Sequence, residues 1–246
     1  MTVKIKTDLL VIGAGAGGLS VAAGAAQLGI KVVLLEGDKM GGDCLNYGCV
    51  PSKALIAFSN QRKPKQFNHA MGFIRDAINE IEPHDSEERF RSLGVNVIRE
   101  YGQFVNETTV AAGAYEIQSR RIVIATGVHT PVPDISGLSG VQYHTNQTIF
   151  DLTKKPEHLL VLGGGPVGVE LAQAFARLGV NVTIFEKRKL LSNFSREQVE
   201  ILKGSLVEDG VSLKEDACVN KISEVDGKLV VQLKNDNKIT GSHLLV

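Results

Sequence analysis

The sequence of 246 residues contains little cysteine and carries no excess of charge of either sign. Three cysteines are too few to hold a small secreted scaffold together with disulfides. Lysine plus arginine and aspartate plus glutamate both number 27, so no global basic field exists to capture nucleic acid or an anionic membrane. Hydrophobic residues at 43% and charged residues at 22% exclude a largely disordered chain. The length fits one large domain or two modest ones.

A long uncharged run near the N-terminus, Leu9 to Ile30, has the length of a membrane span or a signal peptide. It contains six glycines, however, and a related copy of it carries Glu170 and Arg177 inside the run. Those charges argue against both interpretations. We therefore expect no membrane partner and a cytoplasmic location.

An internal repeat organises the chain. Leu9–Glu36 and Leu159–Glu186 align without a gap at an offset of 150, with 12 identities in 28 positions. Each copy has a short apolar run, a glycine-rich turn, a helix-like stretch and a second apolar run that ends in an acid. This order is typical of a βαβ unit with a parallel sheet.

The repeat predicts an α/β fold with two Rossmann-like dinucleotide-binding units, three-layer parallel sheets and a small antiparallel β-meander. We place one dinucleotide-binding domain, which we expect to be incomplete, at residues 1–150 and a second at 151–246. The apolar run that ends at Val246 has no following cap or turn, so we expect the second domain to be truncated. Between the copies, the pattern predicts helices with an apolar stripe at Ala77, Ile78 and Ile81. It then predicts short strands, with a break at Ser119-Arg120 between Tyr115–Gln118 and Arg121–Ile124.

The glycine-rich turns are the first chemical motif. Each has the form Gly-x-Gly-x-x-Gly, in which the glycines allow a tight turn and close approach of a pyrophosphate to the backbone. Glu36 and Glu186 each lie 23 residues after the first glycine, where a carboxylate can bind ribose hydroxyls. A single such turn could be a packing contact, but two in βαβ context predict two adenine dinucleotides. The glycines are Gly13, Gly15 and Gly18 in the first copy, and Gly163, Gly165 and Gly168 in the second.

The choice between NAD and NADP stays open at the second turn. Glu186 favours NAD, because a carboxylate repels a 2′-phosphate. Lys187, Arg188 and Lys189 follow at once and could instead hold that phosphate, or could form a solvated turn. We expect NAD on the strength of the acid.

A cysteine pair, Cys44 and Cys49, follows the first copy with four residues between the thiols. In a cytosolic protein such a pair is more often catalytic than structural, and two inert core thiols are the alternative. Zinc would need two further ligands that no neighbouring motif supplies, so we expect no metal site. A helix starting near Cys44 would lower the pKa of its thiol, which suits thiol–disulfide exchange. Cys218 stands alone in an apolar pattern and is expected in the core.

The segment Gly41–Lys53, with the sequence GGDCLNYGCVPSK, resembles the active-site signature of the flavoprotein (pyridine nucleotide) disulfide oxidoreductases. The chain is similar throughout to the branch of mercuric reductase and dihydrolipoamide dehydrogenase, from the first glycine turn through Ile122–Gly127 to the second. The resemblance implies FAD on the first unit and NAD(P)H on the second. Electrons would then pass from the nicotinamide through FAD to the cysteine pair.

The resemblance also implies individual roles. Cys49 would face the flavin, Cys44 would attack substrate, and Lys53 would lie near the flavin, paired with Glu170. An ordinary pair of surface charges is the alternative for Lys53 and Glu170. The cofactor-binding residues implied are Gly13, Gly15, Ala16, Gly18, Glu36, Gly42, Asp43, Cys44, Lys53, Ala125, Thr126 and Gly127 for FAD, and Gly163, Gly165, Pro166, Val167, Gly168, Glu186 and Lys187 for NAD(P).

Two departures from the family pattern stand in the signature. Asp43 replaces a more usual threonine near the expected pyrophosphate, and Tyr47 replaces a smaller residue. The family's catalytic His-Glu pair is expected beyond Val246, and the six histidines present here are expected at the surface. The substrate implied is a small disulfide, a dithiol or a mercuric ion, with a homodimer for the longer protein. The alternative is a non-catalytic FAD- or NAD-binding module or an inactive N-terminal fragment.

Overall fold

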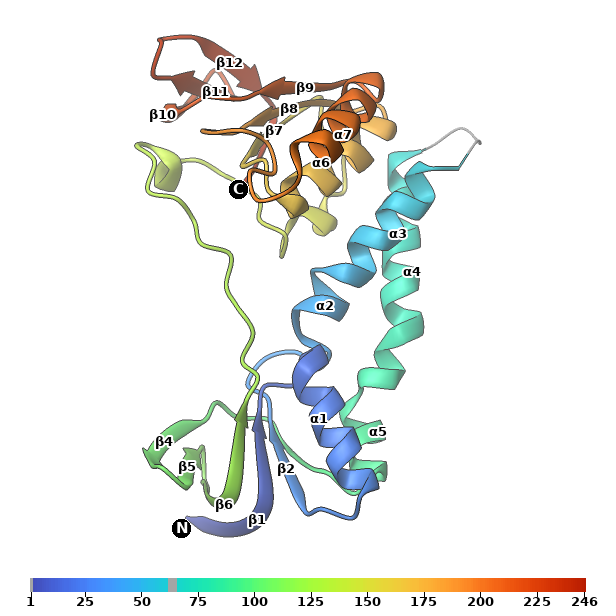
Figure 1. Ribbon diagram of the computed structural model, residues 1–246, viewed down its shortest axis with the longest axis vertical. Coiled ribbons are helices and arrows are strands. Elements are labelled where there is room, and N and C mark those ends of the chain that lie inside the picture. Colours follow the sequence, from blue (N-terminus) through green and yellow to red (C-terminus); the bar gives the residue numbers. More distant parts are fainter. Residues whose placement is uncertain (1, 62–65) are drawn as a thin grey trace. The chain divides into compact units, whose positions relative to one another are not determined.

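The computed structural model describes residues 2–61 and 66–246 (Figure 1). The chain forms two compact units. The first combines residues 1–51 with 76–129, and the second combines residues 52–75 with 130–246. The two copies of the repeat therefore fall in different units, and each unit is described separately below.

The first unit is built on a six-stranded sheet with the order β3-β2-β1-β6-β5-β4. Strands β1, β2, β3 and the neighbouring β6 run parallel to one another, and β4, β5 and β6 form an antiparallel meander. Leu9 on β1 pairs with Val32 on β2 and with Arg121 on β6. The strands are β1 (Val3–Ile12), β2 (Val32–Leu35), β3 (Asn96–Ile98), β4 (Gln103–Asn106), β5 (Thr109–Ala112) and β6 (Tyr115–Ile124).

Two helices, α1 and α5, cover one face of this sheet (Figure 1). Leu19 and Ala22 of α1 and Phe90 of α5 pack with Val11 and Leu34 of the sheet in one buried cluster. The opposite face forms a second buried cluster that includes residues of the antiparallel strands. The helices are α1 (Ala16–Gln27), α2 (Gly42–Asn46), α3 (Cys49–Ser59), α4 (Phe67–Asp85) and α5 (Glu87–Ser92), of which α3 and α4 continue into the second unit.

The second unit has a four-stranded parallel sheet with the order β13-β7-β8-β9 and a separate antiparallel sheet with the order β10-β11-β12. The antiparallel sheet packs on the parallel one through Leu160, Leu244, Ile222 and Val231. The elements of the second unit, besides parts of α3 and α4, are η1 (Leu138–Gly140), η2 (Ile149–Asp151), β7 (His158–Leu162), α6 (Pro166–Arg177), β8 (Asn181–Phe185), α7 (Arg196–Glu208), β9 (Val211–Lys214), β10 (Val219–Val225), β11 (Lys228–Leu233), β12 (Lys238–Gly241) and β13 (His243–Leu245). The predicted α/β class, with two βαβ units and an antiparallel meander, is confirmed.

The two copies of the repeat share their backbone conformation. The first glycine of each turn has a positive φ, 103° at Gly13 and 108° at Gly163. Each helix then ends at a leucine followed by Gly29 or Gly179, with φ of 77° and 76°. A side chain would strain all four positions, so the glycines recur for a conformational reason.

Several local predictions are wrong. Ser119-Arg120 does not break a strand, because β6 runs without interruption along β1, with Thr7 opposite Ser119. The predicted apolar stripe of α4 is only partly correct, because Ala77 and Ile78 are half-buried and Ile81 is exposed. The buried residues of this helix are Phe67, Ala70, Met71 and Ile74. Cys218 precedes β10 and is half-buried rather than a core residue of a strand.

Candidate functional site

The first glycine turn is shaped by contacts between backbone atoms. A Cβ at Gly18 would stand 1.8 Å from the carbonyl oxygen of Gly13, and one at Gly13 would stand 2.3 Å from that of Ala125. The N–H of Ala125 also donates to the carbonyl of Ile12 at 2.8 Å. The turn and the Ala125–Gly127 segment are therefore held together, and Gly127 has a positive φ of 70°.

Both turns leave backbone N–H groups available to bind an anion. Helices α1 and α6 each have twelve residues and begin after a glycine, Gly15 or Gly165, with no side chain capping the first N–H groups. A Cβ at Gly165 would meet nothing within 4 Å, and one at Gly15 would meet only Gly42 Cα at 3.8 Å. The open space and the uncapped donors fit a dinucleotide pyrophosphate at each turn.

The two acids at the strand ends are used in the same way. Glu36 accepts the N–H of Ala14 at 2.6 Å and that of Asp38 at 2.7 Å. Glu186 accepts the N–H of Gly164 at 2.8 Å and that of Arg188 at 2.9 Å. Each carboxylate therefore ties its glycine turn to the end of the second strand. These bonds hold each acid in place beside its turn, and the binding of a ribose by either acid stays a prediction.

The three basic residues that follow Glu186 differ in their surroundings. Lys189 forms an ion pair with Asp216, and the N–H of Leu190 donates to Glu215 at 2.7 Å. Lys187 and Arg188 are exposed. Only two of the three basic side chains therefore remain available to a ligand beside Glu186.

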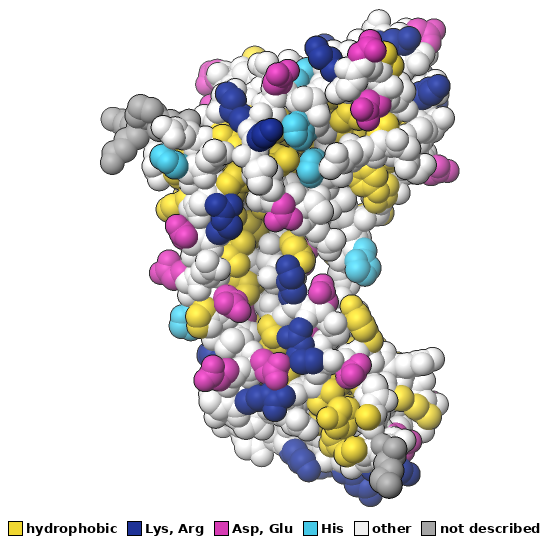
Figure 2. All heavy atoms as spheres, turned by 180° about the vertical axis from the view of Figure 1, so that it is seen from behind, with side chains coloured by type: hydrophobic (Ala, Val, Ile, Leu, Met, Phe, Trp, Pro, Cys, Tyr) yellow, Lys and Arg dark blue, Asp and Glu magenta, His cyan; other side chains and the backbone are white. Residues whose placement is uncertain are grey.

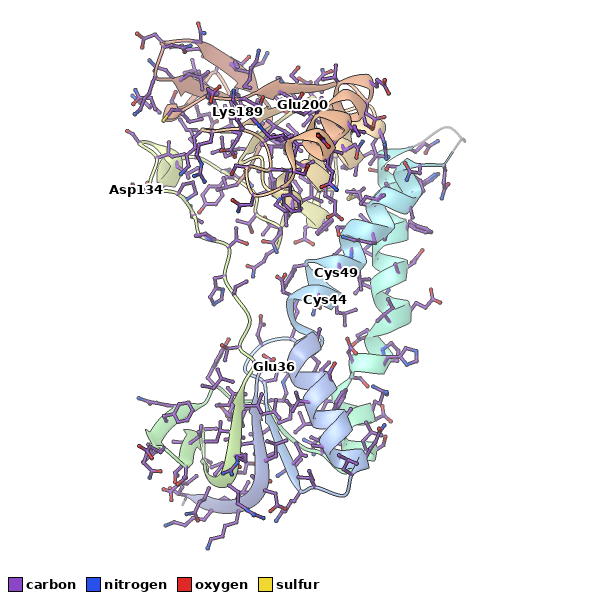
Figure 3. The ribbon with its side chains drawn as sticks, in the orientation of Figure 1. Glu36, Cys44, Cys49, Asp134, Lys189 and Glu200 are labelled. Carbon is purple, nitrogen blue, oxygen red and sulfur yellow. The ribbon has the colours of Figure 1, made fainter. Side chains whose placement is uncertain are left out.

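The cysteine pair spans two short segments of helix. Cys44 is the third residue of α2, and Cys49 opens α3 (Figure 3). The Asn46 side chain donates to the carbonyls of Met40 at 3.0 Å and Gly42 at 2.8 Å, which ties the segment between the cysteines back to the residues that precede Cys44. Both cysteines are free thiols that are hydrogen-bonded to each other. The pattern of cysteines did not reveal the part played by Asn46.

Burial raises the pKa of the Cys44 thiol above its ordinary value, and the hydrogen bond and charge of Cys49 raise it further. The backbone N–H of Cys49 acts in the opposite direction, while the carboxylate of Asp85 adds to the rise. The sequence-based expectation of a lowered pKa at Cys44 is therefore wrong. It is wrong because burial and the neighbouring Cys49 raise the pKa, with a smaller contribution from Asp85 at the distant end of α4, and because α2 is a helix of only five residues.

This raised pKa predicts slow alkylation of Cys44 at neutral pH. In the reduced protein, iodoacetamide should react with Cys44 mainly at alkaline pH, because the thiolate is the nucleophile. Cys49→Ser should shift the reaction profile to lower pH, since two of the raising influences come from Cys49. Mass spectrometry of samples quenched across the pH range measures both, with Cys218→Ser as the matched control. A parent profile at lower pH than that of free glutathione would contradict the prediction.

Gly41 and Gly42 connect the cysteine segment with the first turn. A Cβ at Gly42 would stand 2.6 Å from Gly15 Cα, and Gly15 forms a parallel β-bridge with Gly41. The Asp43 carboxylate is exposed and lies against Gly48, where a Cβ would come within 3.1 Å of Oδ2. The Asp43 carboxylate therefore points to the loop between the two cysteines.

In the second unit, Lys53 of α3 donates to Glu170 of α6 at 2.7 Å. Lys53 is 64% exposed and Glu170 is 24% exposed, so this ion pair alone contributes at most about 1 kcal/mol to stability. Pro166 and Val167 open α6 directly after the second turn. The part that these residues play toward a cofactor stays a prediction.

The histidines divide into two groups. His69, His84 and His129 are exposed, as expected. His144, His158 and His243 are half-buried, and burial lowers the pKa of each below its ordinary value. The expectation that all six are surface residues is wrong, because β7, β13 and the segment beside β13 carry three of them into the sheet.

Among residues 2–61 and 66–246, no helix combines the length and the apolar character that a membrane crossing needs. On the face shown in Figure 2, Lys and Arg side chains are interspersed with Asp and Glu side chains. This mixture agrees with the balanced composition.

Residues 7–246 match the family model described as pyridine nucleotide-disulphide oxidoreductase. Mercuric reductase of Bacillus cereus is 33% identical over 97% of this chain and 41% of its own length. Mercuric reductase of Streptomyces lividans is 34% identical over 97% of this chain and 56% of its own length. Dihydrolipoyl dehydrogenase of Staphylococcus aureus is 31% identical over 98% of this chain and 56% of its own length. The chain thus spans about half the length of these relatives.

The fold is also similar to that of a solved structure. HOCl-induced flavoprotein disulfide reductase RclA from Escherichia coli superimposes with a TM-score of 0.89 and 29% identity. The match covers 97% of this chain and 55% of that one.

Proposed function

Because the chain belongs to the pyridine nucleotide-disulphide oxidoreductase family, whose members use FAD and NAD(P), we propose that it carries electrons from NAD(P)H to the Cys44–Cys49 pair. The supporting observation is the hydrogen-bonded thiol pair, whose segment packs against the first glycine turn through Gly42 and Gly15. A pure binding module has no use for two such thiols. The substrate class is a small disulfide, a dithiol or a mercuric ion.

The first turn and Glu36 would hold FAD, and the second turn and Glu186 would hold the nicotinamide dinucleotide. Bound FAD supplies a hydride acceptor that can pass an electron pair to a disulfide. Lys53 and Glu170 form the ion pair that the family resemblance assigns to the flavin. We also propose that the longer protein forms the homodimer that the resemblance implies.

The cysteines divide the exchange chemistry between them. The Cys44 thiolate attacks a substrate disulfide, so that a Cys44–substrate bond forms, the substrate bond breaks and one product thiol leaves. The Cys49 thiolate then attacks the Cys44 sulfur, which releases the second product thiol and closes the Cys44–Cys49 disulfide. The two protons of the starting thiols end on the two product thiols, and two electrons leave the protein.

An anaerobic reductive titration tests this function. With the cysteine pair oxidised, protein saturated with FAD should take up two electrons more than Cys44→Ser or Cys49→Ser, because each variant lacks the reducible disulfide. Reduced parent protein should show a broad long-wavelength absorbance, which Cys49→Ser abolishes while flavin stays bound. Cys218→Ser is the matched control and should behave as the parent does.

Two results would overturn the proposal. Equal electron uptake by the parent and both variants would show that the pair is not a redox centre. FAD and NADH binding without any electron transfer would instead leave a non-catalytic module. A long-wavelength band that persists in Cys49→Ser would show that the roles assigned to Cys44 and Cys49 are reversed.

A further inference from the structure

An exposed aromatic ring lies beside the first ribose-binding acid. A Cβ at Gly37 would stand 2.6 Å from Cγ, Cδ1 and Cε1 of Tyr101, so the ring lies directly over the Gly37 backbone. Gly37 follows Glu36, which is labelled in Figure 3 and comes directly after β2. Tyr101 is nevertheless 75% exposed. The contact therefore uses a small part of the side chain and leaves most of the ring open to solvent.

Backbone pairing brings Tyr101 to this place. Leu35 on β2 is paired with Ile98 on β3, and the N–H of Glu36 donates to the carbonyl of Ile98 at 3.0 Å. The Arg99 guanidinium also donates to the carbonyl of Asp38. The segment after β3 is thus fastened along the residues that follow β2, and the ring is carried with it.

The second half of the repeat serves as an internal comparison. Phe185 pairs with Lys214, and the N–H of Glu186 donates to the carbonyl of Lys214 at 2.8 Å. Three residues beyond Lys214 stands Ala217, which is buried, whereas three residues beyond Ile98 stands Tyr101. Lys187 occupies the position that corresponds to Gly37. The pairing of a ring with a glycine is therefore particular to the first site.

We propose that Tyr101 is a stacking platform for the adenine of FAD at the first site. The inference rests on the proposed function, in which Glu36 binds the ribose that carries this adenine. A base joined to that ribose falls within reach of the residues beside Glu36, and an aromatic ring stacks on the π-face of any base. Because the ring is mostly exposed, its burial contributes little to the fold, so a ligand-binding role explains it better than packing does.

Gly37 completes the arrangement. Its φ lies outside the positive range, so alanine is compatible with the backbone there, but the added Cβ would meet the ring atoms at 2.6 Å. Gly37→Ala should therefore displace the ring without removing it. This variant separates the position of the ring from its presence.

The test compares FAD with FMN, which lacks the adenine. Flavin fluorescence titrations of the chain should give a Kd for FAD that rises roughly tenfold in Tyr101→Ala and in Gly37→Ala, as expected for loss of one stacked base. The Kd for FMN should stay unchanged in both. Tyr101→Phe keeps an aromatic ring and should bind FAD as the parent does. Phe104→Ala is the matched control, since it removes another exposed ring from β4, at the opposite edge of the same sheet.

The outcomes distinguish this inference from the proposed function. If Tyr101→Ala binds FAD as tightly as Phe104→Ala does, Tyr101 is not a stacking platform. Equal weakening of FAD and FMN in Tyr101→Ala would also overturn the inference, because the ring would then act through the fold. If the parent protein binds FAD no more tightly than FMN, the adenosine site and the proposed function both fail.

Discussion

Gly18→Ala is expected to lower the affinity for FAD at least tenfold and to reduce the free energy of unfolding. The added Cβ would stand 1.8 Å from the carbonyl oxygen of Gly13, a backbone atom that can move only if the turn opens. Overpacking of this kind costs about 1–3 kcal/mol. Opening the turn also displaces the uncapped N–H groups at the start of α1, which are the expected pyrophosphate donors. Flavin fluorescence titration and chemical denaturation measure the two effects.

Two matched variants sharpen this prediction. A Cβ at Gly17 would meet nothing within 4 Å, so Gly17→Ala should leave FAD binding unchanged and stabilise α1 by up to about 1 kcal/mol. Gly168→Ala repeats the collision in the second copy, where the Cβ would stand 2.3 Å from the carbonyl oxygen of Gly163. It should weaken NADH binding and spare FAD. Equal FAD affinity in Gly17→Ala and Gly18→Ala would contradict the steric account.

The turns and their acids could be predicted because their requirements are local. A glycine whose Cβ would meet a backbone oxygen cannot be replaced without moving the chain, so the spacing from Gly13 to Gly18 survives in both copies. The same spacing placed Glu36 and Glu186 at the ends of β2 and β8. What the spacing did not show is that each carboxylate also accepts two backbone N–H groups.

Features set by partners distant in sequence could not be predicted. The strand β6 stays continuous at Ser119 because β1 pairs along it, and no local pattern reports that partner. The pKa of Cys44 depends on burial and on Asp85, which lies 41 residues further along the chain and belongs to another helix. Tyr101 reaches Gly37 only through the pairing of β2 with β3. In each case, the sequence reveals the residue but not its neighbour.

NADH should bind the second site at least tenfold more tightly than NADPH, a preference of about 1.4 kcal/mol or more. The Glu186 carboxylate is held in place by the N–H groups of Gly164 and Arg188, so it cannot turn away from a 2′-phosphate without losing both bonds. Lys189 is already paired with Asp216. A carboxylate fixed at this point can accept a hydrogen bond from the ribose 2′-hydroxyl of NADH, and it repels the 2′-phosphate of NADPH.

Nicotinamide fluorescence titrations of the chain with each dinucleotide measure this preference directly. Glu186→Gln should reduce it, because the amide is similar in shape and removes the charge. Glu36→Gln changes the same position of the first copy and should leave the preference intact, which makes it the matched control. Lys187 and Arg188 act against this preference, because they are exposed, follow Glu186 directly and could attract the 2′-phosphate of NADPH. A parent protein that prefers NADPH, and that loses this preference when Lys187 and Arg188 are changed to alanine, would show that the two cations outweigh the acid.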